Sequence, residues 1–137
     1  MTMYRFLRLL AVSITLFVCA GCALLRSNNE SAISYGTYPE NYRRLITDYM
    51  APFLHDPDSS IYTNWRGPAR GFLTSNSGIT YGYRVCTDID FRTKTGAYNG
   101  SRLYLFMISN GRVVQHEGGY LSGSVDTELL SRICKGL

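Results

Sequence analysis

Four cysteines are the residues of this sequence whose type and spacing bear most directly on chemistry. Cys19 and Cys22 stand close together at the end of an apolar segment, and Cys86 and Cys134 follow much later in the chain. Cysteines can form a disulfide, bind a metal ion, act as a redox pair or carry a lipid. The segment that surrounds each cysteine decides between these roles.

His116 and Glu117 could act as a general base and the group that orients it. Adjacent residues of a strand point to opposite faces of a sheet, so we interpret this pair as two polar residues at a strand end. The nucleophile elbow Gly-x-Ser-x-Gly is absent from the sequence. A small envelope hydrolase that uses His116 remains an alternative, but the sequence favours a protein that is not an enzyme.

Asp88 and Asp90 lie two positions apart and would share one face of a strand. Two carboxylates so placed can divide acid and base roles or hold calcium. Arg84 and Arg92 flank them on the same face, and we interpret the four residues as a charge-balanced, solvent-facing side of a sheet. The sequence therefore predicts no catalytic residue and no cofactor.

The first 21 residues have the pattern of an export signal. Arg5 and Arg8 precede an apolar run over positions 9–20, which ends in small residues. The run is too short to span a bilayer, which needs about 20 apolar residues, and a retained anchor is the alternative. Removal of residues 1–21 lowers the formal net charge of +4 by two. The remaining charge is too mild to predict a nucleic-acid partner.

The residues Cys19-Ala20-Gly21-Cys22 resemble a bacterial lipobox, in which small residues precede a cysteine that is acylated and becomes the mature N-terminus. The pattern usually has Leu where Cys19 stands. The resemblance implies a lipoprotein in which Cys22 carries the lipid, palmitate included, and Cys19 leaves with the signal peptide. Ala23 rather than Asp follows, which in the sorting pattern implies the outer membrane, with the protein on its periplasmic face.

The mature chain divides into a tether and one domain. Residues 22–36 show no sustained period and include Ser27-Asn28-Asn29-Glu30-Ser31, so we predict a flexible coil that spans about 20 Å. Residues 37–137 carry the periodic patterns of a folded domain.

A helix is predicted at the start of the domain. Thr37-Tyr38-Pro39-Glu40 matches a capping box with Thr37 as the N-cap. Pro52 should loosen the last turn, and Asp56-Pro57 should end the helix. The apolar residues recur at helical spacing and form one face: Tyr42, Leu45, Ile46, Tyr49, Met50, Phe53 and Leu54.

Extended segments occupy the middle of the domain. Residues 79–91 alternate with period two, which predicts a long strand with one solvent-facing side and a bulge within it. Asn76-Ser77-Gly78 predicts a turn, and Asn110-Gly111 predicts a two-residue hairpin. The other predicted extended segments are 61–62, 70–74, 103–108, which is apolar throughout, and 112–115, before Gly118-Gly119.

A last helix closes the domain, with Asp126 or Ser124 as its cap. Its inward residues should be Val125, Leu129, Leu130, Ile133 and Leu137. The order is therefore helix, three or four antiparallel strands, and helix. We predict an α+β fold with both helices on one face of a meander.

Only Cys86 and Cys134 can pair within the domain once the two N-terminal cysteines are assigned. The periplasm is oxidising, and closing a loop of about 49 residues would stabilise the domain by roughly 4 kcal/mol. Cys86 lies opposite the apolar row of its strand, so a disulfide requires the last helix to reach that face or a bulge to change the parity. Two buried thiols are the alternative. A zinc site is not expected, because only His55 and His116 could complete it.

Residues 54–62, 85–90 and 96–100 resemble a family of small exported Gram-negative proteins. That family pairs a Leu-x-Asp-Pro-x-Ser-Ala element with a Cys-Gly-x-Val-Asn strand and a Gly-Gly-Tyr-x-Gly loop. The resemblance implies export and supplies no catalytic residue; we interpret the elements as a helix stop and a tight loop closed by Tyr98. The matching residues are Asp56, Pro57, Ser59, Cys86, Gly96, Tyr98 and Gly100, and the departures are Ser60, Thr87, Asp90 and Thr95.

These patterns favour a non-catalytic lipoprotein, held at the membrane by its N-terminal lipid and bound to an envelope protein or secretion assembly. The alternative is an inhibitor or immunity-type binder that uses the loop 93–100 together with Tyr81, Tyr83 and Tyr98. In either case the candidate binding loop contains Tyr98, Asn99 and Gly100.

Overall fold

The computed structural model describes residues 33–119 and 127–137. Cys22, the signal segment and the expected cap residues Ser124 and Asp126, with Val125, lie outside these ranges. The chain separates into the units Met1–Ala32 and Ile33–Leu137, and the second unit is the folded domain. Its elements are α2 (Tyr42–Met50), the 3₁₀ turns Ala51–Phe53 and Pro57–Ser59, β1 (Ile61–Ser75), β2 (Gly78–Asp90), β3 (Arg102–Ser109), β4 (Arg112–Gly118) and α3 (Thr127–Lys135).

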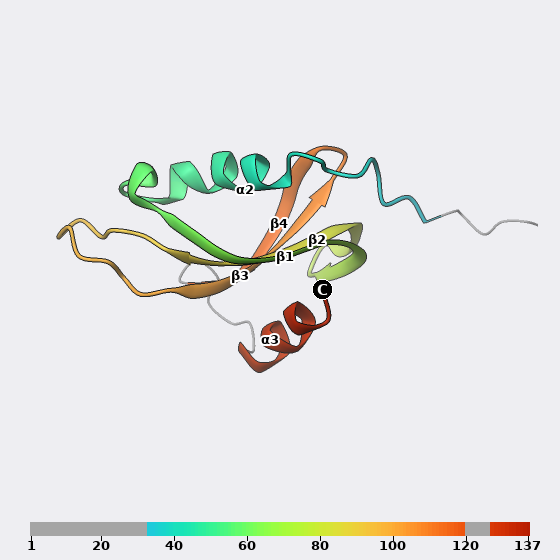
Figure 1. Ribbon diagram of the computed structural model, residues 1–137. Coiled ribbons are helices and arrows are strands. Elements are labelled where there is room, and N and C mark those ends of the chain that lie inside the picture. Colours follow the sequence, from blue (N-terminus) through green and yellow to red (C-terminus); the bar gives the residue numbers. More distant parts are fainter. Residues whose placement is uncertain (1–32, 120–126) are drawn as a thin grey trace, which may run out of the picture. The chain divides into compact units, whose positions relative to one another are not determined.

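The four strands form one antiparallel sheet in the order β1-β2-β3-β4, so each strand pairs with its neighbour in sequence (Figure 1). This confirms the predicted meander and the α+β class. Asn110 and Gly111, at the turn between β3 and β4, have φ angles of 49° and 72°. Both values are positive, as the predicted two-residue hairpin requires.

Strand β1 is a single long strand, where the sequence predicted only two short extended segments. Its register against β2 shifts between Thr63 and Arg66 and again between Arg66 and Ala69, and on both occasions β1 holds one extra residue. Asn64 in this stretch has a φ of 52°. The bulge expected within β2 therefore lies in its partner. These irregularities break the alternation from which a strand is recognised.

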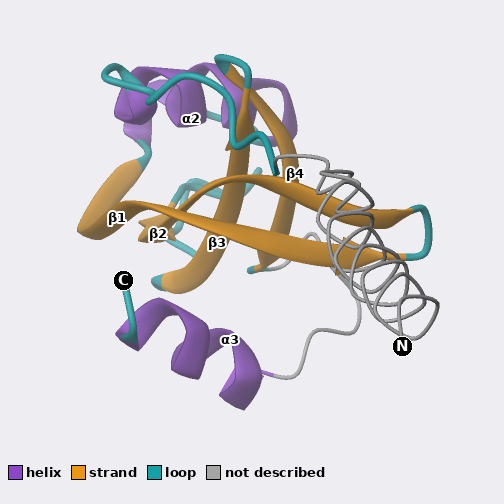
Figure 2. Cartoon of the chain, turned by 90° about the vertical axis from the view of Figure 1, so that its right-hand side faces the viewer, coloured by secondary structure: helices purple, strands orange, loops and turns teal. Residues whose placement is uncertain are grey.

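The two helices cover opposite faces of the sheet, so the prediction that both lie on one face is wrong (Figures 1 and 2). Ile46 of α2 packs in one core cluster with Phe106, and Leu130 of α3 packs in a second cluster with Leu105. Phe106 and Leu105 are neighbours on β3 and point to opposite sides. An apolar strand that is buried on both faces needs a cover on both faces.

Helix α2 begins at Tyr42, and the predicted capping box at Thr37 is wrong. Asn41 occupies the N-cap position without a side-chain hydrogen bond. The preceding residues pack on the sheet instead, because Pro39 is buried and the ring of Tyr38 lies edge-on to Tyr83 at a centroid distance of 5.4 Å. Tertiary contacts outweigh the local capping preference at this position.

The buried faces of both helices include fewer residues than the sequence predicted. Pro52 lies in the 3₁₀ turn that follows α2, which confirms the loosened last turn. Phe53, predicted on the inward face, is 48% exposed, and Leu129 of α3 is 51% exposed. Leu130 is buried, so the buried side of α3 is narrower than its sequence pattern indicated.

Candidate functional site

Cys86 of β2 and Cys134 of α3 form a disulfide, with their Cα atoms 5.8 Å apart. Both residues are fully buried. Of the two routes open to this bond, the structure uses the first: α3 lies on the face of the sheet that carries Cys86, and no change of parity in β2 is needed. The side of β2 that was expected to face solvent is therefore covered by α3 at Cys86.

His116 of β4 packs beneath the C-terminal end of α2. Its Nδ1 atom and the Tyr49 hydroxyl are joined by a hydrogen bond of 2.8 Å. The rings of Phe53 and Phe106 also contact it, at centroid distances of 5.9 and 6.1 Å. Burial lowers the pKa of His116 against a smaller opposing effect of Glu117, and burial raises the pKa of Tyr49. Both shifts favour the uncharged forms of the His116 imidazole and the Tyr49 hydroxyl, which together link β4 to α2.

Glu117 lies on the other face of the sheet from His116. It pairs with Leu105 in the strand register, whereas His116 pairs with Phe106. The Glu117 carboxylate accepts a hydrogen bond of 2.8 Å from the Gln115 amide. The expectation that these adjacent residues point to opposite faces of the sheet is confirmed by this geometry.

Asp88 is part of a polar contact between β1 and β2. Its Oδ2 atom accepts a 2.9 Å hydrogen bond from the Asn64 amide and lies 3.7 Å from the Arg66 guanidinium. The charge of Asp88 is therefore balanced by Arg66 of the neighbouring strand β1. The sequence had predicted Arg84, on the same strand as Asp88. The Nε atom of Arg84 is buried and has no hydrogen-bond partner among the described residues.

The loop between β2 and β3, residues 93–100, is fastened to the strands at its base. Asp90 Oδ1 accepts a 2.9 Å hydrogen bond from the Gly100 amide, and the Thr93 amide donates to the Ala97 carbonyl at 2.9 Å. Asp90 thus satisfies a loop amide and holds the end of the loop against β2. Arg92 and Tyr98 form an isolated antiparallel bridge across the loop.

Tyr98 connects this loop to the turn that follows α2. Its hydroxyl donates a 3.2 Å hydrogen bond to the Ser59 carbonyl, and the Arg92 guanidinium lies 5.2 Å from the centre of its ring. The Tyr98 side chain is nevertheless 44% exposed. The Asp-Pro-x-Ser element and the Gly-x-Tyr-x-Gly loop, which carried the family resemblance, therefore meet in space.

The tyrosines proposed for a binder do not form one exposed surface. Tyr83 is 5% exposed and belongs to the core, Tyr81 is partly buried, and Tyr98 lies beyond the other end of β2. Tyr83 is therefore excluded from an exposed binding surface. Tyr98 remains a candidate contact residue, with the backbone of Asn99 and Gly100 beside it.

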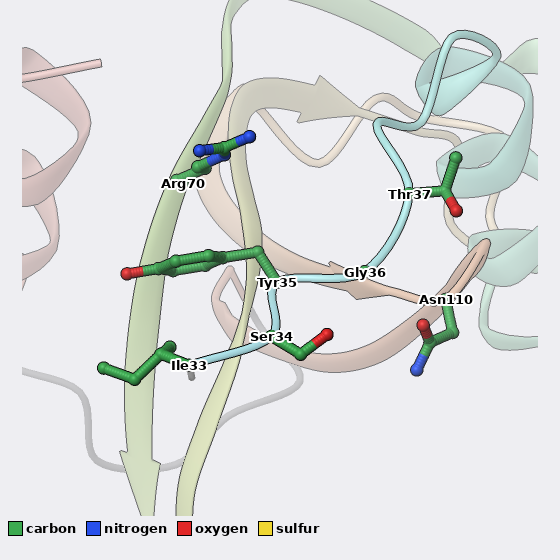
Figure 3. Close-up of a pocket in the computed structure, with 7 residues that line it drawn as sticks. All are labelled: Ile33, Ser34, Tyr35, Gly36, Thr37, Arg70 and Asn110. Atoms are coloured by element: carbon green, nitrogen blue, oxygen red, sulfur yellow. The ribbon is translucent and has the colours of Figure 1, made fainter. Parts of the chain in front are cut away.

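An open hollow of about 540 Å³ lies where the described chain begins (Figure 3). Ile33, Tyr35 and Arg70 gather on one side of it, and Asn110 lies on the other. Residues 33–36, which the sequence assigned to the tether, run along the sheet here. A second hollow of about 510 Å³ adjoins α3 and includes Leu129 and Phe72 in its lining.

Two features of the structure were not predicted from the sequence. One is the Tyr49–His116 pair, which joins residues far apart in the chain. The other is the exposed apolar pair Phe72 and Ile79, on either side of the turn between β1 and β2. The turn signal at Asn76-Ser77 would have located Phe72 and Ile79 if β1 had been recognised as a strand up to that turn.

Comparisons with protein-family models, with curated proteins and with solved structures find no match to this chain. Within residues 33–119 and 127–137, no three His, Cys, Asp or Glu side chains are grouped so that they could hold a metal ion. Neither of the helices in this part of the chain has the length and apolar content of a membrane span. A proposal about function therefore rests on the sequence and on the geometry of the described residues.

Proposed function

We propose that this protein is a non-catalytic lipoprotein of the bacterial cell envelope, anchored through Cys22 at the periplasmic face of the outer membrane. The observation that carries the proposal is the buried Cys86–Cys134 disulfide. Structural disulfides form and persist in oxidising compartments, which a protein reaches by export. The basic, apolar and small-residue segments before Cys22 provide such an export signal.

The contacts of the candidate catalytic groups support a non-catalytic role. His116 is engaged by Tyr49, Asp88 by Asn64 and Arg66, and Asp90 by the Gly100 amide. Each contact joins two elements of the fold, so these groups contribute to packing and loop geometry. A hydrolase would need at least one of them beside a free nucleophile.

The loop 93–100 is the surface that we assign to an envelope-protein partner. Tyr98 presents an exposed aromatic ring whose position is fixed by Ser59 and Arg92. Tyrosine is enriched among residues that dominate binding energy, and a loop that is ordered before binding loses less entropy. The same loop would serve an inhibitor or immunity-type binder, and the identity of the partner distinguishes the two functions.

Lipidation is tested by replacing Cys22 and, as a matched control, Cys19. Cys22→Ser should remain an unacylated precursor, whereas Cys19→Leu should yield a mature chain that begins with acylated Cys22. Detergent phase partition and the intact mass of the purified protein report both results. If the wild-type protein has the mass and the partition of the Cys22→Ser variant, the lipoprotein proposal is wrong.

The binding loop is tested by cross-linking in native membranes, followed by mass spectrometry of the attached proteins. Tyr98→Ser should remove the cross-linked partner. Tyr38→Ser is the control, because Tyr38 is a tyrosine of nearly equal exposure, 45% against 44%, outside the loop. Loss of the partner in both variants or in neither would contradict the assignment of the loop.

A further inference from the structure

The hairpin of β1 and β2 projects past the four-stranded part of the sheet (Figure 2). Strand β2 pairs with β3 only from Tyr83 onward, whereas β1 and β2 remain paired up to Ser75 and Gly78. We call residues 70–82 the arm. Two of its large apolar side chains, Phe72 and Ile79, are each 56% exposed, the highest values among the large hydrophobic residues described.

An aromatic strip with a cation at one end runs across the arm. The rings of Phe72 and Tyr81 are 6.1 Å apart, and those of Tyr81 and Tyr35 are 6.0 Å apart. The Arg70 guanidinium then lies 5.7 Å from the centre of the Tyr35 ring. Apolar side chains beside tyrosine and arginine are typical of protein segments at the bilayer interface. A tyrosine there buries its apolar ring and keeps its hydroxyl in water.

The charge of the arm is of one sign. Arg70 is the one charged residue of the arm, and no Asp or Glu occurs between Asp58 and Asp88. Arg66 and Arg84 flank the arm, and Arg66 lies 3.7 Å from the Asp88 carboxylate. Arg70 is exposed at the surface. A segment with cations and no carboxylates is attracted to anionic phospholipid headgroups, which contribute a negative surface potential.

The chain leaves the domain beside the arm. Ile33, the first described residue, is 53% exposed and shares the hollow of Figure 3 with Tyr35 and Arg70. The sequence has 11 residues from Cys22 to this point, and a chain of that length reaches at most about 40 Å. A lipid on Cys22 would therefore keep the arm close to the bilayer, where even a weak affinity suffices at high effective concentration.

We propose that the arm docks on the phospholipid bilayer as a second membrane contact. Phe72 and Ile79 enter the boundary of the acyl chains, Tyr81 and Tyr35 lie at headgroup level, and Arg70 binds phosphate. The inference rests on the proposed function, because the lipid on Cys22 brings the arm to the membrane. The proposal also implies an orientation of the domain, because the loop 93–100 lies beyond the far end of the 13-residue strand β2, about 40 Å along the strand from the tip of the arm.

The experiment measures vesicle binding without the lipid. The mature chain with Cys22→Ser, exported on a signal peptide that is not a lipoprotein signal, is mixed with vesicles of equal parts phosphatidylethanolamine and phosphatidylglycerol. The double change Phe72→Ser with Ile79→Ser should lower the partition coefficient by about tenfold, because both side chains lose apolar area that is buried in the bilayer. Arg70→Gln should reduce the preference for these vesicles over phosphatidylcholine.

The matched control replaces two equally exposed apolar residues outside the arm, Ile61→Ser with Val114→Ser, which are 48% and 49% exposed. Its partition should equal that of the parent chain. The intact disulfide mass and the near-ultraviolet circular dichroism verify that each variant is folded. Equal partition of the parent and the Phe72/Ile79 variant overturns the membrane contact, whatever the acylation state of Cys22.

A photo-crosslinking residue at Phe72 of the lipidated protein in cells gives an independent result. A phospholipid adduct at this position supports the proposal. A protein adduct overturns it and makes the arm a protein-binding surface. Acylation of Cys22, measured by mass on the same sample, reports separately on the proposed function.

Discussion

The two faces of the sheet are covered by helices of equal length, nine residues each, but are held by different forces. On the α2 face, Ile46 and Met50 are fully buried within a core of aromatic and aliphatic side chains. On the α3 face, the helix contributes Leu130 and Cys134 to a smaller cluster. Helix α3 buries little apolar area and therefore gains little stability from the hydrophobic effect. The disulfide supplies the additional stability that holds α3 on the sheet.

Removal of the disulfide should have the largest effect. We expect Cys86→Ala with Cys134→Ala to lower the free energy of unfolding by about 4 kcal/mol, because a loop of about 49 residues is no longer closed. The loss should fall first on α3, with α2 still protected. Urea unfolding and amide hydrogen exchange measure both effects. Equal loss of protection in the two helices would show that the faces are not independent.

Truncation of one buried side chain on each face gives the next largest effect. Ile46→Ala should cost about 3 kcal/mol, and Leu130→Ala about 2 kcal/mol, because the thinner α3 cluster can collapse further around the cavity. Denaturant unfolding of the oxidised proteins gives the two values. A larger cost for Leu130→Ala would reverse the assignment of the main core to the α2 face.

The hydrogen bond between Tyr49 and His116 should contribute less than either core side chain. Tyr49→Phe should cost about 1 kcal/mol, because it leaves a partly buried ring nitrogen of His116 without its partner. Tyr98→Phe removes an exposed hydroxyl contact and should cost less than about 0.5 kcal/mol. If the two variants lose equal stability, burial of the Tyr49–His116 hydrogen bond adds nothing to the stability of the α2 face.

The smallest effect is a pH dependence of the α2 face. Burial lowers the pKa of His116 in the folded state, so the unfolded chain takes up the proton first, near the usual value of about 6.5. Stability is therefore intact above this pH and falls as the pH drops through the lowered folded pKa. Unfolding followed between neutral and mildly acidic pH should show this loss. It should disappear in His116→Gln and persist in His55→Gln, which changes an exposed histidine.

The parts of the fold that were predicted correctly are those fixed by local rules. The alternation of residues 79–91 located β2, and Asn110-Gly111 located the hairpin, because both patterns depend on neighbouring residues only. The disulfide was left open in the sequence, since its formation depends on where α3 lies. Nothing in the local pattern of the last helix specifies which face of the sheet it covers.

The errors have tertiary causes. Thr37 matched a capping box, but packing of Tyr38 and Pro39 on the sheet delays the helix. β1 was divided because its two bulges interrupt the period. The candidate site shows the same limit: Tyr98 was identified from the sequence, whereas its contact with Ser59 depends on the folded chain. One clue was available, because an apolar run on both parities of β3 requires a cover on each face.

The bond between Cys86 and Cys134 also changes what a protease can do to this protein. The two residues are 48 positions apart and enclose β3, β4 and most of α3 in one covalent ring. A single cut anywhere between them opens the ring and releases no fragment, since both new ends remain joined through sulfur. Nearly half of the residues 33–137 lie within this ring, and only reduction or a second cut can release a piece of it.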